Sequence, residues 1–305
     1  MRPLIAEYSD AIHRPGLWRL GILAVAVLAA GIGCAAAKRN PEPKFNPDNL
    51  TLRAQQAEAK GDVAGALQQY LQALGVSQGT DNLEAAAHNL NDIGSIYYNQ
   101  HDYDKALQFY FEALRTNERL GNARGKATNL GNIGCVYAAQ GRFKEAIENQ
   151  QQAIQLDEQE RNWIGKAKRL NNLGFVYLKM GDLDKAMEYL TAAEKLNTDF
   201  KDEAGRAANL CNIGSIHEVR GDPSAAMKFY EEAAAIDKST ESFEGLAMDL
   251  HNCGRVAEAL GHLDKARDYY ARALHVNELL NREQEISHDL EDYSRVEKQL
   301  KSQKR

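Results

Sequence analysis

Hydrophobic and small residues recur along most of this chain with a period of 40 residues. A leucine column consists of Leu90, Leu130, Leu170, Leu210, Leu250 and Leu290, and a glycine column consists of Gly94, Gly134, Gly174, Gly214 and Gly254. A period of this size indicates a stack of repeated units, in which each unit buries its apolar face against its neighbours.

Each unit contains two stretches with helical spacing. Apolar and small residues three and four positions apart form one helix face. In the first complete unit, the face of the first helix comprises Ala87, Leu90, Ile93, Gly94 and Tyr97, and that of the second comprises Ala106, Phe109, Tyr110, Ala113 and Leu114. A glycine inside a helix costs about 1 kcal/mol relative to alanine. The repeated glycine therefore predicts that a neighbouring helix approaches closely at this position.

Glycine and aspartate mark the turn between the two helices. A glycine suited to a left-handed helix end stands at Gly61, Gly141, Gly181, Gly221 and Gly261. An aspartate that can cap the second helix follows at Asp62, Asp102, Asp182 and Asp222. Each unit is thus predicted to be a helix-turn-helix.

This pattern resembles the tetratricopeptide repeat. The resemblance rests on Leu90, Ile93, Gly94, Tyr97, Ala106, Tyr110, Ala113 and their copies. The 40-residue spacing and the Asn-Leu-Gly-like runs, such as Asn172-Leu173-Gly174, look like the extended subclass of kinesin light chains and cell-polarity adaptors. The resemblance implies an all-α fold, a right-handed α-α superhelix (solenoid) of about six helix-turn-helix units.

The repeat domain is expected to span residues 49–300. A degenerate first unit covers about 46–84, with Ala54 in place of the glycine. A C-terminal capping helix covers about 284–300, where Asp292 and Ser294 replace the usual asparagine and glycine. A polar end helix suits a stack that must close its exposed end, and residues 301–305 are expected to form a polar tail.

The N-terminal segment 1–37 is predicted to be an export or anchoring segment. Residues 20–37 are apolar and uncharged, and Lys38 and Arg39 follow them. Gly31-Ile32-Gly33-Cys34 resembles a lipobox, which would make Cys34 the lipidated residue of a bacterial lipoprotein, although Gly31 stands where leucine is usual. Cleavage after residues 35–37 is a second interpretation. A retained transmembrane anchor is a third, because 18 apolar residues just reach spanning length.

Residues 38–48 form a proline-rich linker, in which three prolines favour an extended spacer. We therefore expect the repeat domain to lie at the cell envelope as a membrane-anchored, periplasm-facing lipoprotein. A retained N-terminal anchor is the alternative.

The resemblance implies that the first helices line a concave groove. Its predicted peptide-binding residues comprise a polar ladder of Asp92, Asn132, Asn172, Asn212 and Asn252, together with Phe175, Lys168, Lys179 and Arg255. An amide both donates and accepts, so the ladder could bind the main chain of an extended peptide. It could equally bond the adjacent helix and hold the stack together, and the sequence leaves both interpretations open.

Composition and motifs argue against other classes of function. The formal charge of −6 does not favour nucleic acid. The four cysteines form no CxxC pair and no cluster with histidine, so no metal site is predicted. No catalytic or phosphate-binding motif is present, so we expect no enzyme activity, no cofactor and no small-molecule substrate.

The expected function is that of a membrane-tethered scaffold that binds a protein or peptide partner in the groove. The alternative is a structural subunit of a cell-envelope or secretion assembly, which would use its convex face and the ends of its stack.

Overall fold

The computed structural model of this chain describes residues 46–303. The described residues belong to one compact unit. The segment 1–37 with Cys34, and most of the linker 38–48, lie outside the described residues, so the predictions made for them stay predictions.

Thirteen α-helices follow one another between residues 46 and 303, and that part of the chain contains no strand. The first helices of the units are α2 (Pro47–Glu58), α4 (Leu83–Asn99), α6 (Ala123–Ala139), α8 (Trp163–Met180), α10 (Glu203–Val219), α12 (Phe243–Ala259) and α14 (Glu283–Gln303). The second helices are α3 (Val63–Gly79), α5 (Tyr103–Leu120), α7 (Phe143–Gln159), α9 (Leu183–Phe200), α11 (Pro223–Ser239) and α13 (Leu263–Leu279). The all-α prediction is confirmed.

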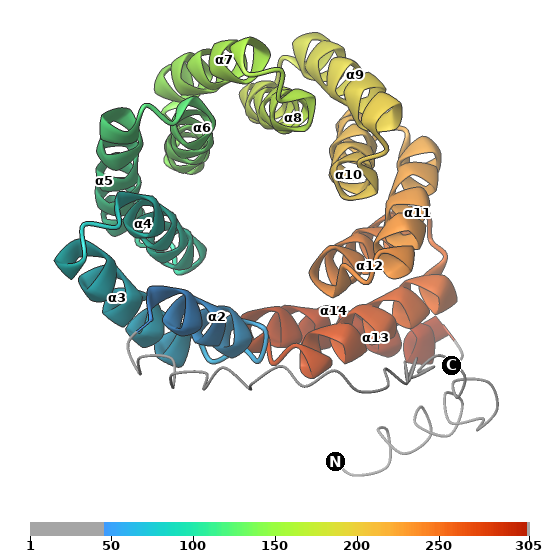
Figure 1. Ribbon diagram of the computed structural model, residues 1–305. Coiled ribbons are helices and arrows are strands. Elements are labelled where there is room, and N and C mark those ends of the chain that lie inside the picture. The colour runs from blue at the N-terminus through green and yellow to red at the C-terminus, as the bar shows by residue number, and fades with distance from the viewer. Residues whose placement is uncertain (1–45, 304–305) are drawn as a thin grey trace, which may run out of the picture. The chain divides into compact units, whose positions relative to one another are not determined.

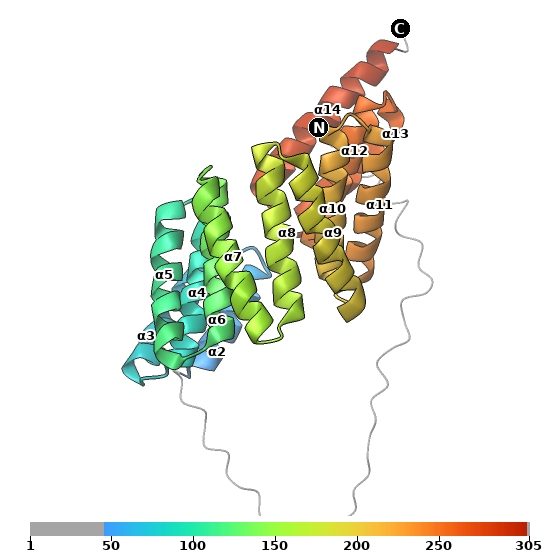
Figure 2. The same cartoon turned by 90° about the horizontal axis from the view of Figure 1, so that it is seen from above.

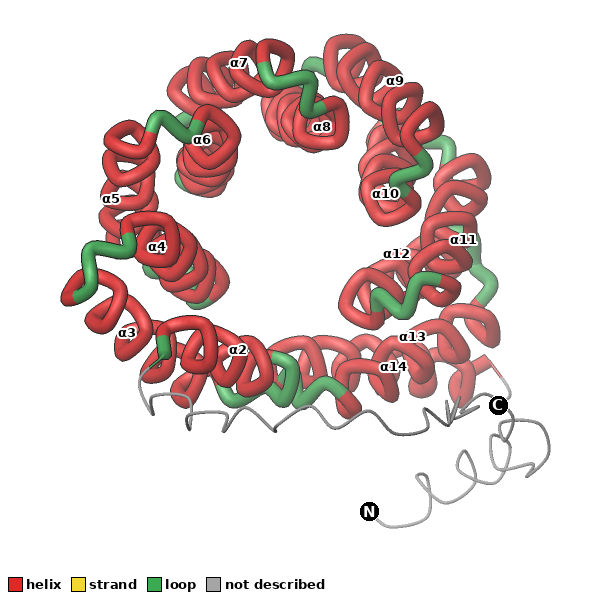
Figure 3. Tube along the Cα trace, in the orientation of Figure 1, coloured by secondary structure: helices red, strands yellow, loops and turns green. Residues whose placement is uncertain are grey.

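The helices stack into a superhelix in which each helix packs against the next one along the chain. Helices α4, α6, α8, α10 and α12 lie on the inside, and α5, α7, α9 and α11 lie outside them (Figure 1). Figure 2 shows the same helices standing side by side, and Figure 3 shows the short turns between them. The superhelix curves until the turn between α2 and α3 meets the turn between α13 and α14. A Cβ placed on Gly61, in the first of these turns, would lie 3.3 Å from the main-chain oxygen of Leu280, in the second.

The predicted turn residues act as expected. The side chains of Asp62, Asp102, Asp182 and Asp222 each accept a hydrogen bond from a main-chain N–H in the first turn of the following helix. The five predicted glycines have φ between +74° and +82°. Two domain boundaries differ slightly from the prediction. Asn46 caps α2, which therefore begins at Pro47 inside the predicted linker, and α14 continues to Gln303 inside the predicted tail.

The glycine column marks the closest approach of the two helices in a unit. A Cβ on Gly94 would lie 2.7 Å from the ring of Tyr110, and one on Gly214 would lie 2.9 Å from the ring of Tyr230. Real Cβ atoms do not approach other atoms this closely, so an alanine here would force the helices apart. The fully buried tyrosines Tyr70, Tyr230 and Tyr270 fill this layer of the core.

A column of buried polar pairs also runs through the stack. Each pair consists of one residue of a second helix and one residue of the next first helix, twelve positions later, and all members are at most 5 % exposed. The pairs are Ser77–Asn89, Asn117–Asn129, Asp157–Arg169, Asn197–Asn209, Asp237–Asp249 and Asn277–Asp289. We call them the buried polar pairs.

In most of these pairs the two side chains bind each other through a hydrogen bond or an ion pair. Asn117 Nδ2 donates to Asn129 Oδ1 at 2.8 Å, and Asn197 donates to Asn209 in the same way. Asp157 forms an ion pair with Arg169 at 3.6 Å. A buried polar group is tolerated when it has such a partner, so these pairs add polar links between successive units.

The pair Asp237–Asp249 is different because it places two carboxyl groups together. Burial is the main reason that the pKa of Asp249 rises to about 7, and the nearby charge of Asp237 raises it further. Burial also raises the pKa of Asp237. The pair therefore opposes folding when both groups are ionised.

Replacing Asp249 with asparagine, the residue at the equivalent positions 89, 129 and 209, should stabilise the protein most at high pH. The folded pKa of about 7 lies above the ordinary value of 3.8. The stability that Asp249 contributes is thus complete below pH 3.8 and is lost as the pH rises through 7. Between pH 5 and pH 8 the advantage of Asp249→Asn should grow by about 2–3 kcal/mol, since one pKa unit corresponds to 1.36 kcal/mol.

Urea unfolding at both pH values measures this difference. The reciprocal variant Asn209→Asp should lose stability, and more at pH 8 than at pH 5. An effect of Asp249→Asn that is the same at both pH values would contradict the assignment.

Candidate functional site

The inner surface of the superhelix is formed by the exposed faces of the first helices, because the second helices lie outside them (Figure 1). Three columns of exposed or half-buried residues flank the polar ladder. They are His88, Thr128, Lys168, Ala208 and Met248; Ser95, Cys135, Phe175, Ser215 and Arg255; and Asn99, Ala139, Lys179, Val219 and Ala259. Except for Lys168, the sequence prediction omitted the first column, although it precedes the ladder by one helical turn.

The predicted ladder lies on this surface, but it also holds the stack together. All five of its members are half-buried. Asn132 Nδ2 donates to Asn91 Oδ1 of the preceding unit at 2.8 Å, and Asn212 Nδ2 donates to Asn171 Oδ1 at 3.0 Å. Asn132 and Asn212 therefore each use one amide N–H to hold neighbouring units together, as the structural interpretation of the ladder predicts.

The same acceptors connect the ladder to the buried polar pairs. Asn91 Oδ1 also accepts from the buried Asn129 at 3.2 Å, and Asn171 Oδ1 accepts from the buried Asn209 at 3.1 Å. A continuous chain of amides thus runs from the second helix, through the buried pair, to the inner surface. The sequence contains a signal for this series of linked amides, because a polar residue precedes every member of the leucine column.

Asn172 departs from this arrangement. The residue equivalent to Asn91 and Asn171 is Gly131, which has no side chain to accept a hydrogen bond. The guanidinium group of Arg169 fills the space that a Cβ of residue 131 would need. Within residues 46–303, the Asn172 side chain makes no hydrogen bond, so its donors and its acceptor stay available on the inner surface.

Helix α7 compensates for the unusual residues around Gly131. Gln150, which stands where other units have a tyrosine or leucine, is fully buried. Its Nε2 donates to the main-chain oxygen of Gly131 at 2.8 Å. Gln150 thus makes a buried polar link to α6 at a position where the other second helices place an apolar or aromatic side chain.

Helix α8 brings together three of the other predicted site residues. Lys168 and Lys179 are exposed, and Phe175 is 38 % exposed. The Lys179 ammonium lies 5.2 Å from the centre of the Phe175 ring. Neither lysine forms an ion pair with any residue of the described part of the chain. The inner face of α8 is therefore positively charged and partly aromatic.

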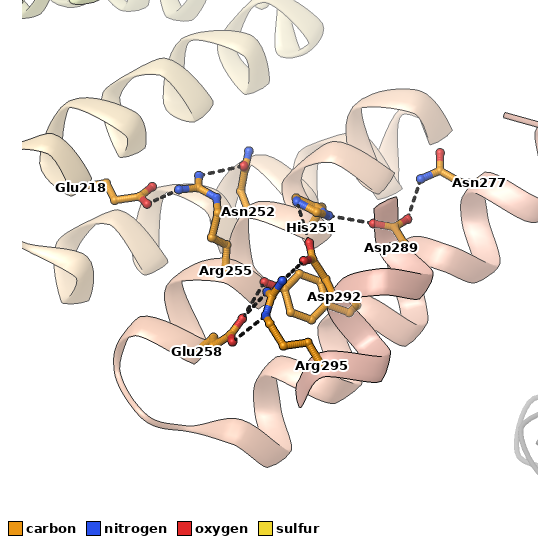
Figure 4. A network of polar contacts seen from close by, with 10 residues as sticks. Glu218, His251, Asn252, Arg255, Glu258, Asn277, Asp289, Asp292 and Arg295 are labelled. Atoms are coloured by element: carbon orange, nitrogen blue, oxygen red, sulfur yellow. Dashed lines mark hydrogen bonds and ion pairs between the residues drawn. The ribbon is translucent and has the colours of Figure 1, made fainter. Parts of the chain in front are cut away.

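The C-terminal part of the inner surface is already occupied by internal contacts (Figure 4). Arg255, another predicted site residue, is ion-paired with Glu218 and donates to Asn252 Oδ1 at 3.1 Å. Asn252 Nδ2 in turn donates to Cys211 Sγ at 3.5 Å. These contacts leave Arg255 with less capacity for a ligand than the lysines of α8.

A second set of contacts in Figure 4 ties α12 to the capping helix α14. His251 Nδ1 lies 2.7 Å from the buried Asp289 Oδ1, and its Nε2 lies 3.6 Å from Asp292. Arg295 binds Glu258 at 2.7 Å. The ladder position is taken here by Asp292, and charged groups replace the amide links of the central units.

The N-terminal end of the ladder is acidic. Burial raises the pKa of Asp92 to about 6, although a hydrogen bond with Asn91 acts in the opposite direction. The inner surface thus changes along the stack, from acidic at α4 to positive at α8 and internally neutralised at α12.

Residues 46–303 offer neither a metal site nor a membrane-spanning helix. Over that range, no group of His, Cys, Asp and Glu side chains could hold a metal ion. None of the helices of that range has the length and apolar character that crossing a membrane requires.

The difference between Asn172 and its neighbours can be measured. Asn212→Ala should lower the free energy of unfolding by about 0.5–1.5 kcal/mol, because it removes a hydrogen bond between units. Asn172→Ala should change it by less than about 0.5 kcal/mol, as expected for a residue without such a bond. Urea unfolding of both variants tests this expectation. Equal losses would mean that Asn172 also holds the stack.

The chain is similar to a known protein family and to several solved structures. The tetratricopeptide repeat family matches residues 83–159 and 166–239. The apo form of RapI is similar in structure, with a TM-score of 0.64 at 13 % identity, over 80 % of this chain and 87 % of that one. No match was found among curated protein sequences.

Two other similar structures contain a bound peptide or factor. The Rap conjugation gene regulator of plasmid pLS20, in complex with the Phr* peptide, has a TM-score of 0.64 at 15 % identity, over 80 % of this chain and 78 % of that one. A Rap protein complexed with competence and sporulation factor has a TM-score of 0.63 at 20 % identity, over 77 % and 64 %. At such identities the likeness concerns the fold alone.

The family match covers α4 to α11, and the same 40-residue period continues on both sides of it. The stacked helix pairs, the glycine contacts and this match agree. The chain belongs to the tetratricopeptide repeat family.

Proposed function

We propose that the protein is a non-enzymatic scaffold that binds a peptide or an extended segment of another protein on the inner surface of its superhelix. One observation carries this proposal: the framework is constant whereas the inner surface varies. The leucine and glycine columns repeat the same residue from α4 to α12, but the first inner column reads His88, Thr128, Lys168, Ala208 and Met248. Such variation on a fixed framework provides different side-chain contacts along one ligand.

The comparisons support a peptide as the class of ligand. Two of the similar structures are named as complexes, one with the Phr* peptide and one with competence and sporulation factor. Family membership supports the more general role of a repeat scaffold.

A second candidate function is that of a structural subunit in a cell-envelope or secretion assembly. The outer helices expose large apolar side chains, including Phe111, Phe200 and Leu279, the last of which is 69 % exposed. Leu290 on the capping helix is 46 % exposed, although the other leucines of its column are buried. An assembly could cover these residues through the convex face and the C-terminal end of the stack.

Bulky substitutions on the two faces distinguish the two functions. Ala208 and Ala259 are exposed on the inner helices α10 and α12, whereas Ala192 and Ala235 are exposed on the outer helices α9 and α11. With residues 43–305 as bait, the double variant Ala208→Tyr/Ala259→Tyr should lose captured partner proteins. The matched outer variant Ala192→Tyr/Ala235→Tyr should keep them.

Both variants must first melt at the same temperature as the parent protein. Loss of partners from the outer variant alone would overturn the groove proposal and would favour the assembly subunit.

We also propose that the N-terminal segment 1–37 tethers the scaffold to the cell envelope through a lipid on Cys34. The apolar run before Cys34 and the proline-rich spacer after it support this role. Labelling cells with a fatty-acid analogue should mark the protein, and Cys34→Ser should abolish the label and release the protein from the membrane fraction. A variant that stays in the membrane without any label would instead indicate a retained anchor.

A further inference from the structure

Four features of α8 coincide on its inner face. Asn172 is the ladder amide that Gly131 leaves without a hydrogen-bond partner. Lys168 and Lys179 are exposed and lack an ion pair among the residues that the structure describes. Phe175 lies between the two lysines along the helix and exposes 38 % of its surface. Each feature belongs to α8 or results from its contact with α6.

The helices on either side of α8 do not neutralise its charge. On α6, the neighbouring inner residues are Thr128, Cys135 and Ala139, which carry no negative charge. On α10, the corresponding residues are Ala208, Ser215 and Val219. Glu218 of α10 is already paired with Arg255.

The positive charge is therefore local, in a chain whose net charge is −6. Two uncompensated ammonium groups in a concave surface attract negative charge, and they do so more strongly than on a flat surface. The exposed ring of Phe175 adds an apolar contact between them.

The spacing of the lysines defines the ligand further. Residues 168 and 179 are separated by three helical turns, or about 16 Å along the axis of α8. An extended peptide advances about 3.3 Å per residue, so in a segment that lies along α8 the groups that meet both lysines would be about five residues apart. Between them, the free amide of Asn172 can both donate to and accept from a peptide main chain.

We propose that the inner face of α8 is the specificity-determining subsite of the scaffold and that it binds an acidic, extended segment of a protein partner. The segment carries two carboxylates about five residues apart, which pair with Lys168 and Lys179. An apolar side chain between them packs on Phe175, and Asn172 bonds the main chain. This assignment rests on the proposed groove function and adds the chemistry of the ligand.

Selection from a displayed library of random 12-residue peptides tests the assignment on the intact chain, purified in a mild detergent. Peptides enriched on the parent protein should contain pairs of Asp or Glu at this spacing. An enriched peptide, labelled with fluorescein, should bind at least tenfold more weakly to Lys168→Gln/Lys179→Gln. The matched variant Lys195→Gln/Lys228→Gln removes the same charge from exposed positions of the outer helices α9 and α11, and its affinity should stay within twofold.

A charge exchange gives an independent check that does not depend on loss of binding. Lys168→Glu/Lys179→Glu should prefer the enriched peptide after its acidic residues are changed to lysine. Raising the salt concentration should weaken the parent complex, because exposed ion pairs are screened.

Four results would overturn the assignment. Enriched peptides without acidic residues, or peptides unaffected by the lysine substitutions, would remove the α8 subsite but leave the scaffold function intact. A 12-nucleotide single-stranded RNA that displaces the peptide with equal or higher affinity would assign the lysines to phosphate instead. No enrichment of any peptide would count against both the subsite and the groove function.

Discussion

The close contact between the two helices of each unit is the constraint on which the rest of this structure depends. At Gly94, Gly214 and Gly254, the second helix places a tyrosine ring where a side chain of the first helix would otherwise lie. The contact fixes the distance between the two helices and is renewed every 40 residues. Since each unit then meets the next in nearly the same way, the stack curves regularly and its first helices come to line one continuous inner surface.

The buried polar pairs add a second constraint, which acts between units. A matched amide pair costs little and links neighbouring units, whereas an unmatched one would leave a polar group without a partner. The unit at α8 shows how such a pair can change only together with its surroundings. Arg169 has the carboxylate of Asp157 beside it and occupies the empty space at Gly131, whose main-chain oxygen accepts a hydrogen bond from Gln150.

The parts of this structure that depend on local rules could be predicted from the sequence. The helix pairs, the left-handed glycines and the aspartate caps follow from periodicity and backbone preferences, and they appear as predicted. The role of the ladder did not follow, because the acceptor of Asn132 lies 41 residues earlier, on a neighbouring helix. The two possible uses of an amide could be separated only when the positions of Asn91 and Gly131 in space were known.

The exception at Asn172 links this architecture to binding. A group that already has a protein partner must give up that bond before it can bind a ligand, whereas an unpaired group at a solvated surface exchanges only water. Asn132 and Asn212 belong to the first class and Asn172 to the second. Gly131 both leaves space for Arg169 in the core and leaves Asn172 without an acceptor on the inner surface. Asn172 lies on the same helix as two lysines that form no ion pair within residues 46–303. In this way a variation in the packing between two units creates a local difference in what the inner surface can bind, without altering the regular stack that presents it.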